Sequence, residues 1–169
     1  MLATKEQLQK WIDAGKKKMR ADSTGIEATL HRNSEVLLRD NEIKNMSIDL
    51  GHRIVEGFSF KLYQPCYKSA PVGLIHDIGV IIDGEVVSRD GIQLILKGGQ
   101  RVMLYDAKTI QDIWWNIVEP ITVFVHKKGG LKPGKHELEV IIAEQIAEYY
   151  EQPLNMIMGD IEATMLVAK

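Results

Sequence analysis

The stretch K-G-G-L-K-P-G-K-H-E-L-E-V, residues 128–140, decides the fold class of this chain. Pro133-Gly134 fits a type II turn, which favours proline at its second position and a residue with positive φ at its third. From His136 to Val140, glutamates then alternate with less polar residues, so one face of the segment is charged and the other is not. The stretch therefore predicts a half-buried antiparallel strand that is entered through a tight corner, as in a β-sandwich.

Short alternating segments separated by tight turns recur through most of the chain. The turns are expected at Asp83-Gly84, at Asp90-Gly91 and at Gly98-Gly99. The expected strands cover residues 36–39, 43–48, 58–63, 78–82, 85–87, 92–96, 101–105 and 121–126, with a short helical turn at 107–112. Strands at this spacing predict a mainly antiparallel β-sandwich, either immunoglobulin-like or jelly-roll-like.

The two ends of the chain are less regular. Residues 4–20 predict a helix, because Thr4 and Gln7 have the spacing of a capping box and apolar residues line one side. Residues 143–150 contain good helix formers, but the two-residue period of the preceding strand favours a continuing strand. Pro153 predicts a loop, and residues 161–167 predict an edge strand. We therefore expect a helix and linker over residues 1–33 and a sandwich domain over residues 34–169.

Composition places this 169-residue chain among ordinary globular domains. It is 45% hydrophobic with a formal net charge of −2, so neither nucleic acid nor a membrane is an expected partner. Cys66 is the only cysteine, so no disulfide can form within the chain. The first ten residues are too polar for a signal peptide, and no apolar run has membrane-spanning length. These features predict a cytoplasmic protein.

The sequence contains no arrangement typical of a catalytic or metal site. The five histidines are scattered rather than spaced as ligands, and His76 and Asp77 would face opposite sides of a strand. Cys66 has no base near it in sequence, which favours an inert thiol. His136 stands at the corner where sandwiches often place a tyrosine that bonds back to the chain, and we expect it to be structural. We expect no catalytic residue and no metal ligand on this chain.

Aromatic residues supply the candidate binding site. Trp114 and Trp115 are adjacent, so only one of them can enter the core from a strand. The other lies on a sheet rim or anchors a partner, as exposed tryptophan and tyrosine often do. The candidate interface residues are Tyr63, Pro65, Tyr67, Pro71, Trp114 and Trp115.

In chain order, these pieces resemble the small, β, subunit of bacterial C-glycoside deglycosidases. The resemblance covers about residues 34–150. It rests on the G-F-S-F strand at 57–60, the proline-containing aromatic loop at 63–72, the I-D-G-E-V-V hairpin at 82–87, Trp115 followed by E-P-I at 119–121, and the corner at 129–140. Val118 stands where the family pattern has glycine.

The resemblance implies a function that composition could not. In that family a large TIM-barrel (α) subunit holds a divalent metal, here expected to be manganese, and cleaves the carbon–carbon bond between a 3-keto sugar and a flavonoid-type aglycone. This chain would be its non-catalytic helper in a larger αβ oligomer, stabilising the large subunit and shaping the mouth of its site. The loop at residues 63–72, with one of the two tryptophans, would dock there.

Two other readings of the sequence remain. The chain could be a free carbohydrate-binding or immunoglobulin-like module, with Trp115 or Tyr67 as the platform on which a sugar stacks. It could also be a small stand-alone metalloenzyme of sandwich or cupin type, which the scattered histidines disfavour.

Overall fold

The computed structural model describes residues 30–32, 34–64, 69–144 and 155–166, and strands dominate this part of the chain. The strands are β1 (Leu30–Arg32), β2 (Ile43–Asp49), β3 (Ile54–Leu62), β4 (Ala70–Pro71), β5 (Ile75–Ile82), β6 (Glu85–Val86), β7 (Ile92–Ile95), β8 (Arg101–Met103), β9 (Trp114–Trp115), β10 (Ile121–His126), β11 (Lys135–Glu144) and β12 (Asn155–Leu166). The helical elements are α2 (Ser34–Leu37) and the 3-10 helices η1 (Val72–Leu74), η2 (Arg89–Gly91) and η3 (Leu104–Thr109).

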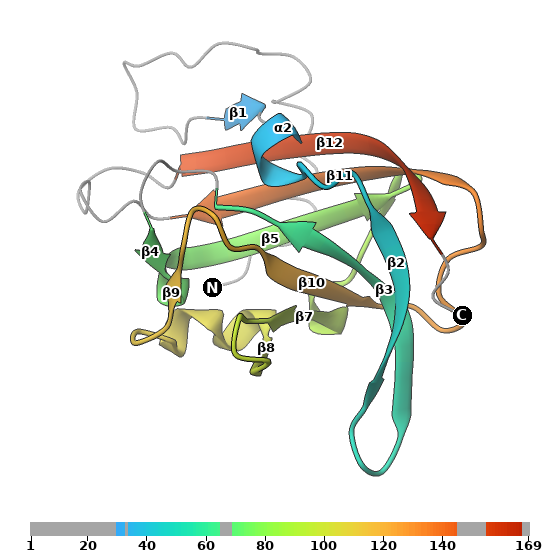
Figure 1. Cartoon of the computed structure of the whole chain (residues 1–169), viewed down its shortest axis with the longest axis horizontal. Coiled ribbons are helices and arrows are strands. Elements are labelled where there is room, and N and C mark those ends of the chain that lie inside the picture. The colour runs from blue at the N-terminus through green and yellow to red at the C-terminus, as the bar shows by residue number, and fades with distance from the viewer. Residues whose placement is uncertain (1–29, 33, 65–68, 145–154, 167–169) are drawn as a thin grey trace.

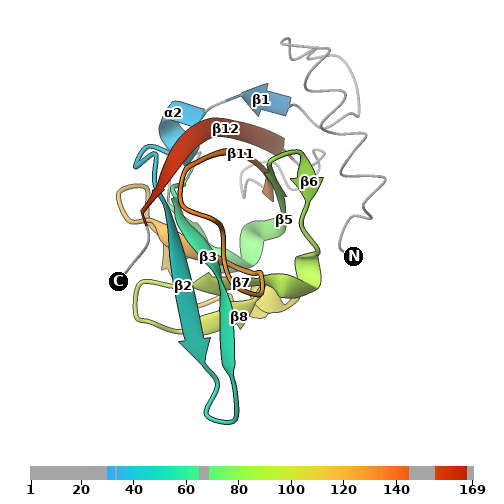
Figure 2. The ribbon, with the colours of Figure 1, turned by 90° about the vertical axis from the view of Figure 1, so that its right-hand side faces the viewer.

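Two layers of strands curl around a shared interior (Figures 1 and 2). One layer has the order β6-β5-β11-β12 and the other has the order β2-β3-β10-β7-β8. The layers are joined because the end of β12 pairs in parallel with the start of β2, where Met165 lies opposite Ile43. Strand β1 also pairs in parallel with β12, and all other neighbours are antiparallel. The prediction of a mainly antiparallel β-sandwich is confirmed.

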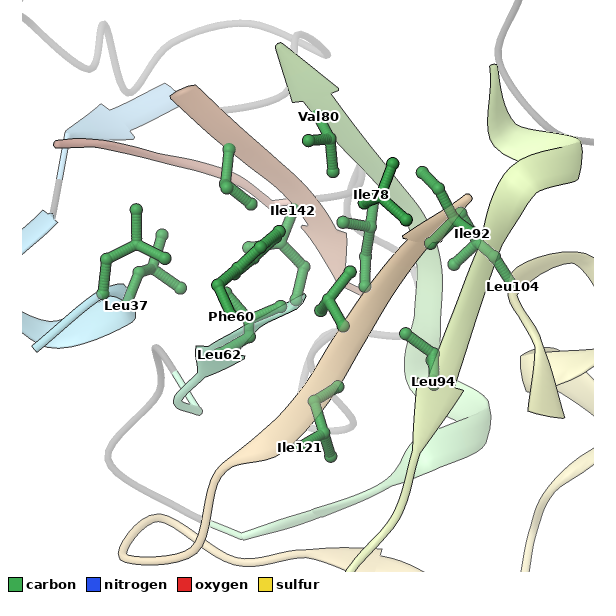
Figure 3. Close-up of a cluster of buried hydrophobic side chains, with 14 of the residues drawn as sticks. Leu37, Phe60, Leu62, Ile78, Val80, Ile92, Leu94, Leu104, Ile121 and Ile142 are labelled. Atoms are coloured by element: carbon green, nitrogen blue, oxygen red, sulfur yellow. The ribbon is translucent and has the colours of Figure 1, made fainter. Parts of the chain in front are cut away.

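The core lies between the two layers. Alternate residues of β5 and β11 point inward and meet those of β3, β7 and β10, as the labelled side chains of Figure 3 show. Fully buried members of this core include Phe58, Leu62, Ile78, Ile92, Leu94, Leu138 and Ile142. Each such side chain stabilises the fold by roughly 1.5–3 kcal/mol relative to an exposed position. Within the part of the chain that the structure describes, no helix is long and apolar enough to cross a membrane.

The predicted hairpin at Asp83-Gly84 is confirmed. Both residues have positive φ, 51° and 80°, as a type I′ turn requires, and the strands on either side pair from Ile81 to Val86. Turns also precede β7 and β8 where the sequence predicted them. The helical turn expected over residues 107–112 begins earlier, at Leu104.

The corner that leads into β11 is held from several sides. The Asn45 side chain donates to the carbonyl oxygen of Leu131 (3.0 Å) and accepts from its amide (2.9 Å). Gly130 has a φ of 65°, and a Cβ there would lie 2.5 Å from Asn45 Oδ1, so only glycine fits. Gly134 has a positive φ of 139°, and the predicted strand follows as β11.

Two expectations for strands are wrong. Residues 36–39 are not a strand: Ser34–Leu37 form one α-helical turn, which buries the neighbouring side chains of Leu37 and Leu38 together. A strand would have turned one of them away from the core. The expected edge strand over residues 161–167 instead begins at Asn155 and lies inside the sheet, between β11 and β2. The loop expected after Pro153 therefore ends by residue 155.

The N-terminal helix expected over residues 4–20 and the end of the long strand, residues 145–150, lie outside the described residues.

Candidate functional site

The two adjacent tryptophans have opposite environments. Strand β9 pairs with β4, which places Trp115 opposite Ala70 and Trp114 opposite Pro71. Trp115 is only 2% exposed, and its indole Nε1 donates to the carbonyl oxygen of Glu119 at 3.1 Å. Trp114 is 57% exposed. The prediction that only one of them enters the core is confirmed, and Trp114 is the one left on the surface.

A tight turn carries two more exposed apolar side chains directly after the tryptophans. Ile117 is 39% exposed and Val118 is 71% exposed. Among the residues whose side-chain burial is described, five large hydrophobic residues are exposed, and three of them fall within residues 114–118. Isolated exposed apolar residues are ordinary, but a group of them in one short segment is a candidate interaction surface. We call Pro71, Trp114, Ile117 and Val118 the apolar patch.

The turn at residues 116–119 is fixed by hydrogen bonds around Glu119. Its amide donates to the carbonyl oxygen of Asn116 at 3.2 Å, and its carboxylate accepts from Asn116 Nδ2 at 2.9 Å. The other carboxylate oxygen pairs with the Lys97 ammonium. The bonds from Lys97 and Asn116 hold the pKa of the Glu119 carboxyl below its ordinary value. Glu119 therefore stays charged, and the turn keeps its shape at neutral pH.

Polar and aromatic groups border the apolar patch on another side. The Arg39 guanidinium lies 3.8 Å from the ring centroid of Tyr63, and its Nη2 donates to the carbonyl oxygen of Ile117 at 3.2 Å. The Tyr63 hydroxyl donates to Asp40 Oδ1 at 2.9 Å. Burial and this carboxylate acceptor raise the pKa of the Tyr63 hydroxyl. Arg39 thus joins the end of β3 to the 116–119 turn and places a cation beside it.

The structure brings only some of the predicted interface residues together. Pro71 and Trp114 lie opposite each other, and Tyr63 is linked to the same surface through Arg39. Trp115 belongs to the core, so it offers no surface for a partner or a sugar. Pro65, Cys66 and Tyr67 lie outside the described residues.

Sequence reasoning missed Ile117, Val118 and Arg39. Ile117 and Val118 have no period that distinguishes exposed from buried positions. One signal was present: Val118 replaces the glycine expected before Glu119, and its backbone does not have the positive φ that would call for glycine. The fold of this chain therefore does not require an apolar residue at position 118.

The histidine at the corner makes the predicted bond back to the chain. Nε2 of His136 donates to the carbonyl oxygen of Lys132, and Nδ1 donates to Asp83 Oδ2, both at 2.7 Å. The second oxygen of Asp83 accepts from the amide of Glu137 at 3.0 Å. His136 therefore ties the β5–β6 turn to the start of β11.

Groups suited to chemistry are sparse in the described residues. No group of three or more His, Cys, Asp or Glu side chains lies close enough there to hold a metal ion. A buried ion pair joins Asp77 of β5 to Arg89 of η2, whose Nε lies 2.9 Å from both carboxylate oxygens. It fastens η2 to the sheet.

Comparison with known protein families identifies most of the chain. Residues 33–149, more than two thirds of the chain, match the family model described as C-glycoside deglycosidase beta subunit. No curated protein matches the chain.

Proposed function

Because the chain belongs to the family of C-glycoside deglycosidase beta subunits, we propose that it is the non-catalytic, accessory subunit of a carbon–carbon lyase. The enzyme would cleave the bond between a 3-keto sugar and an aromatic, flavonoid-type aglycone. The acid–base residues and a divalent metal, expected to be manganese, would belong to a TIM-barrel α subunit. This chain would stabilise that subunit and shape the mouth of its site, within a larger αβ oligomer in the cytoplasm.

The proposed reaction explains why a separate catalytic subunit is needed. A C-glycosidic bond has no leaving oxygen to protonate, so simple acid catalysis cannot break it. A 3-keto group makes the proton at C2 of the sugar acidic, so a base can remove that proton while an electrophile stabilises the enediolate that forms. The aglycone leaves by elimination as its ring carbon is protonated. Such chemistry needs several convergent charged groups, whereas the charged groups nearest Trp114, Lys97 and Glu119, are paired with each other beside apolar side chains.

The apolar patch is the observation that carries this proposal. A subunit of a heteromeric enzyme must expose a surface that its partner covers, and aromatic and aliphatic side chains form the centre of most such surfaces. Trp114, Ile117 and Val118 supply these side chains, and Tyr63 and Arg39 supply a more polar rim. We place the α subunit, with the mouth of its site, against this surface and the adjoining 63–72 loop.

Reconstitution tests the proposal. The chain, a candidate α subunit from the same organism and the mixture are each assayed for release of the aglycone from a 3-keto C-glucoside, and complex formation is followed by size-exclusion chromatography. We expect the mixture to be active and the chain alone to be inactive. Cleavage by the pure chain, or an α subunit whose activity and stability do not change when the chain is added, would overturn the proposal.

Carbohydrate binding by the free chain is the second candidate, because Trp114 is exposed enough to stack on a sugar ring. A sugar platform also needs hydrogen-bonding side chains that are free to meet the sugar, whereas Lys97, Asn116 and Glu119 beside Trp114 bond to one another. We therefore favour a protein partner. Quenching of tryptophan fluorescence by simple sugars would favour the other candidate.

A further inference from the structure

We infer that the 116–119 turn is a preformed docking element that inserts Ile117 and Val118 into an apolar pocket of the α subunit, with Glu119 as the residue that positions it. This inference rests on the proposed function, since it takes the α subunit as the occupant. It goes further in naming the anchoring side chains, the residue that orders them and the chemistry of the receiving pocket.

The first argument is that the turn is ordered before any partner arrives. Glu119 receives bonds through both carboxylate oxygens, from Lys97 and from Asn116, while its carbonyl oxygen accepts from the Trp115 indole. Trp115 itself is fixed in the core. The turn is thus anchored to the sandwich interior, so binding would cost little further ordering of the backbone.

The turn presents aliphatic side chains to a partner. Val118 is more exposed, at 71%, than Trp114 at 57%, although valine is a residue that sandwich folds normally bury. The polar side chains of the turn are already engaged, Asn116 with Glu119 and Glu119 with Lys97. The side chains left for a partner are therefore aliphatic, and the pocket that fits them is apolar.

The Arg39 cation indicates which group should lie at the edge of that pocket. Arg39 is exposed and stacks on Tyr63 while it donates to the carbonyl oxygen of Ile117. A guanidinium has five N–H donors, so this carbonyl bond leaves others to face outward. A carboxylate on the rim of the α-subunit pocket would match this cation and would set the orientation of docking.

A second copy of this chain is a poorer occupant. A twofold contact would need a hollow beside the turn to receive the turn of the other copy, because both copies would use the same surface. A head-to-tail contact needs an apolar hollow elsewhere on the chain. The cavity beside Trp114 has a volume of about 10 Å³, which is smaller than a valine side chain. A second hollow in the part of the chain that the structure describes, of about 460 Å³, is bordered by Asn45, Ser47 and Glu56 as well as Met46, and its polar groups do not suit aliphatic anchors.

The test compares two aliphatic residues that are almost equally exposed, Val118 and Ile54. Val118→Asp places a charge in the proposed pocket, and Ile54→Asp is the matched control, since Ile54 is 69% exposed at the far end of the β2–β3 hairpin. Affinity for the α subunit is measured by surface plasmon resonance, with the melting temperature of each free variant alongside. We expect Val118→Asp to weaken binding by 100-fold or more and Ile54→Asp to change it by less than about threefold, with both melting temperatures near wild type.

A double-mutant cycle tests the role of Glu119 as a positioning residue. Glu119→Gln keeps an acceptor for Asn116 but removes the charge that pairs with Lys97. We expect a loss of affinity of about fivefold in the wild-type background and no further loss when Val118→Asp is already present. Equal losses in both backgrounds would mean that Glu119 acts on the fold rather than through the turn.

The outcomes separate this inference from the proposed function. If wild type binds no α subunit, the proposed function fails and the inference fails with it. If wild type binds and Val118→Asp binds equally well, or if Ile54→Asp is the variant that loses affinity, the inference alone is overturned. If the free chain is a dimer that Val118→Asp converts to a monomer, the turn serves a second copy of the chain and the inference is also overturned.

Discussion

Raising the pH above neutrality should loosen the corner that leads into β11, because His136 can make both its hydrogen bonds only as a cation. Its two ring nitrogens face the Asp83 carboxylate and the Lys132 carbonyl oxygen, each at 2.7 Å. At neutral pH both partners can only accept hydrogen bonds, so both nitrogens must carry a proton. A neutral ring would leave one of the two bonds unmade.

The directions in which the pKa values of His136 and Asp83 shift decide how stability changes with pH. The carbonyl bond to Lys132 and the bond to Asp83 raise the pKa of His136 above its ordinary value of 6.5, against smaller opposing effects of burial and of the Lys127 ammonium. The bond to His136 lowers the pKa of Asp83 below its ordinary value of 3.8. The contribution of His136 is therefore complete below pH 6.5 and is lost as the pH rises through its raised pKa. The contribution of Asp83 is present above pH 3.8 and is lost in stronger acid.

The magnitude can be worked from the two bonds. A hydrogen bond to a charged group contributes about 1.5–3 kcal/mol when it is shielded from water. Asp83 is half exposed, so the bond between His136 and Asp83 is discounted to about 1 kcal/mol. The bond to Lys132 adds about 1 kcal/mol. Deprotonation should thus cost about 1 kcal/mol, and His136→Ala about 2 kcal/mol, or roughly 4–8 °C in melting temperature for a chain of this size.

Urea denaturation at about pH 6 and at about pH 9, on either side of the expected transition, measures the effect. Asp83→Asn is the informative variant, because an amide can donate to the unprotonated Nδ1 while Nε2 still donates to Lys132. Its stability should vary less with pH than that of wild type. His126→Gln, which replaces an exposed histidine at the end of β10, is the matched control and should leave the wild-type pH dependence in place.

Three results would refute this reasoning. The stability of wild type could be the same at both pH values, or Asp83→Asn could keep the full pH dependence. An NMR titration could also show that His136 has a single protonated ring nitrogen at neutral pH. Either of the first two results would mean that the bond between His136 and Asp83 does not control how stability changes with pH. The third would mean that the His136 ring is neutral.

Three other substitutions probe the sandwich itself, each by chemical denaturation of the free chain. Arg89→Ala removes the buried cation that pairs with Asp77 and should cost about 3–5 kcal/mol. Arg89→Lys should recover part of that stability. A loss below about 1 kcal/mol for Arg89→Ala would contradict a buried ion pair. Gly57→Ala should cost about 1–3 kcal/mol, because its Cβ would lie 2.0 Å from a carbonyl oxygen of β10. An unchanged denaturation midpoint would mean that this oxygen does not lie so close to position 57. Asn45→Ala should cost about 1–3 kcal/mol, because it removes both bonds to the Leu131 backbone. A substitution at the nearby exposed position Ser47 is the control, and it should leave the stability unchanged.

Sequence could predict the strands whose burial alternates, and the turns between them, because both signals are local. The run from His136 to Val140 alternates along β11, and Asp83-Gly84 has the chemistry that a type I′ turn demands. The same local geometry required Trp114 and Trp115 to face opposite sides, although it could not say which one was buried. That choice depends on the bond from Trp115 to Glu119 and on the packing of the core, both of which need the folded chain.

The failures occurred where contacts distant in sequence decide the outcome. Leu37 and Leu38 alternate poorly as a strand, and what makes the helical turn favourable is a core built from later segments. The length and central position of β12 depend on β11 and β2 offering a partner edge on each side. The exposure of Val118 was also unpredictable, since an apolar residue before Glu119-Pro120 is as consistent with a buried loop as with a docking surface.

The position of β12 between the two layers has a consequence for how the chain comes to be folded. The link between the layers pairs Ile43, near the start of the sandwich, with Met165, near its end, so the joint cannot form until residues 43–165 are all available. Closing so long a loop is slow, and folds dominated by such pairings need milliseconds to seconds. Until β12 inserts, β11 carries an open row of backbone donors and acceptors, the kind of edge that recruits strands from other molecules. During synthesis, aggregation therefore competes with the final closure of the sandwich, and the amount of usable subunit depends on that race as well as on the stability of the finished fold.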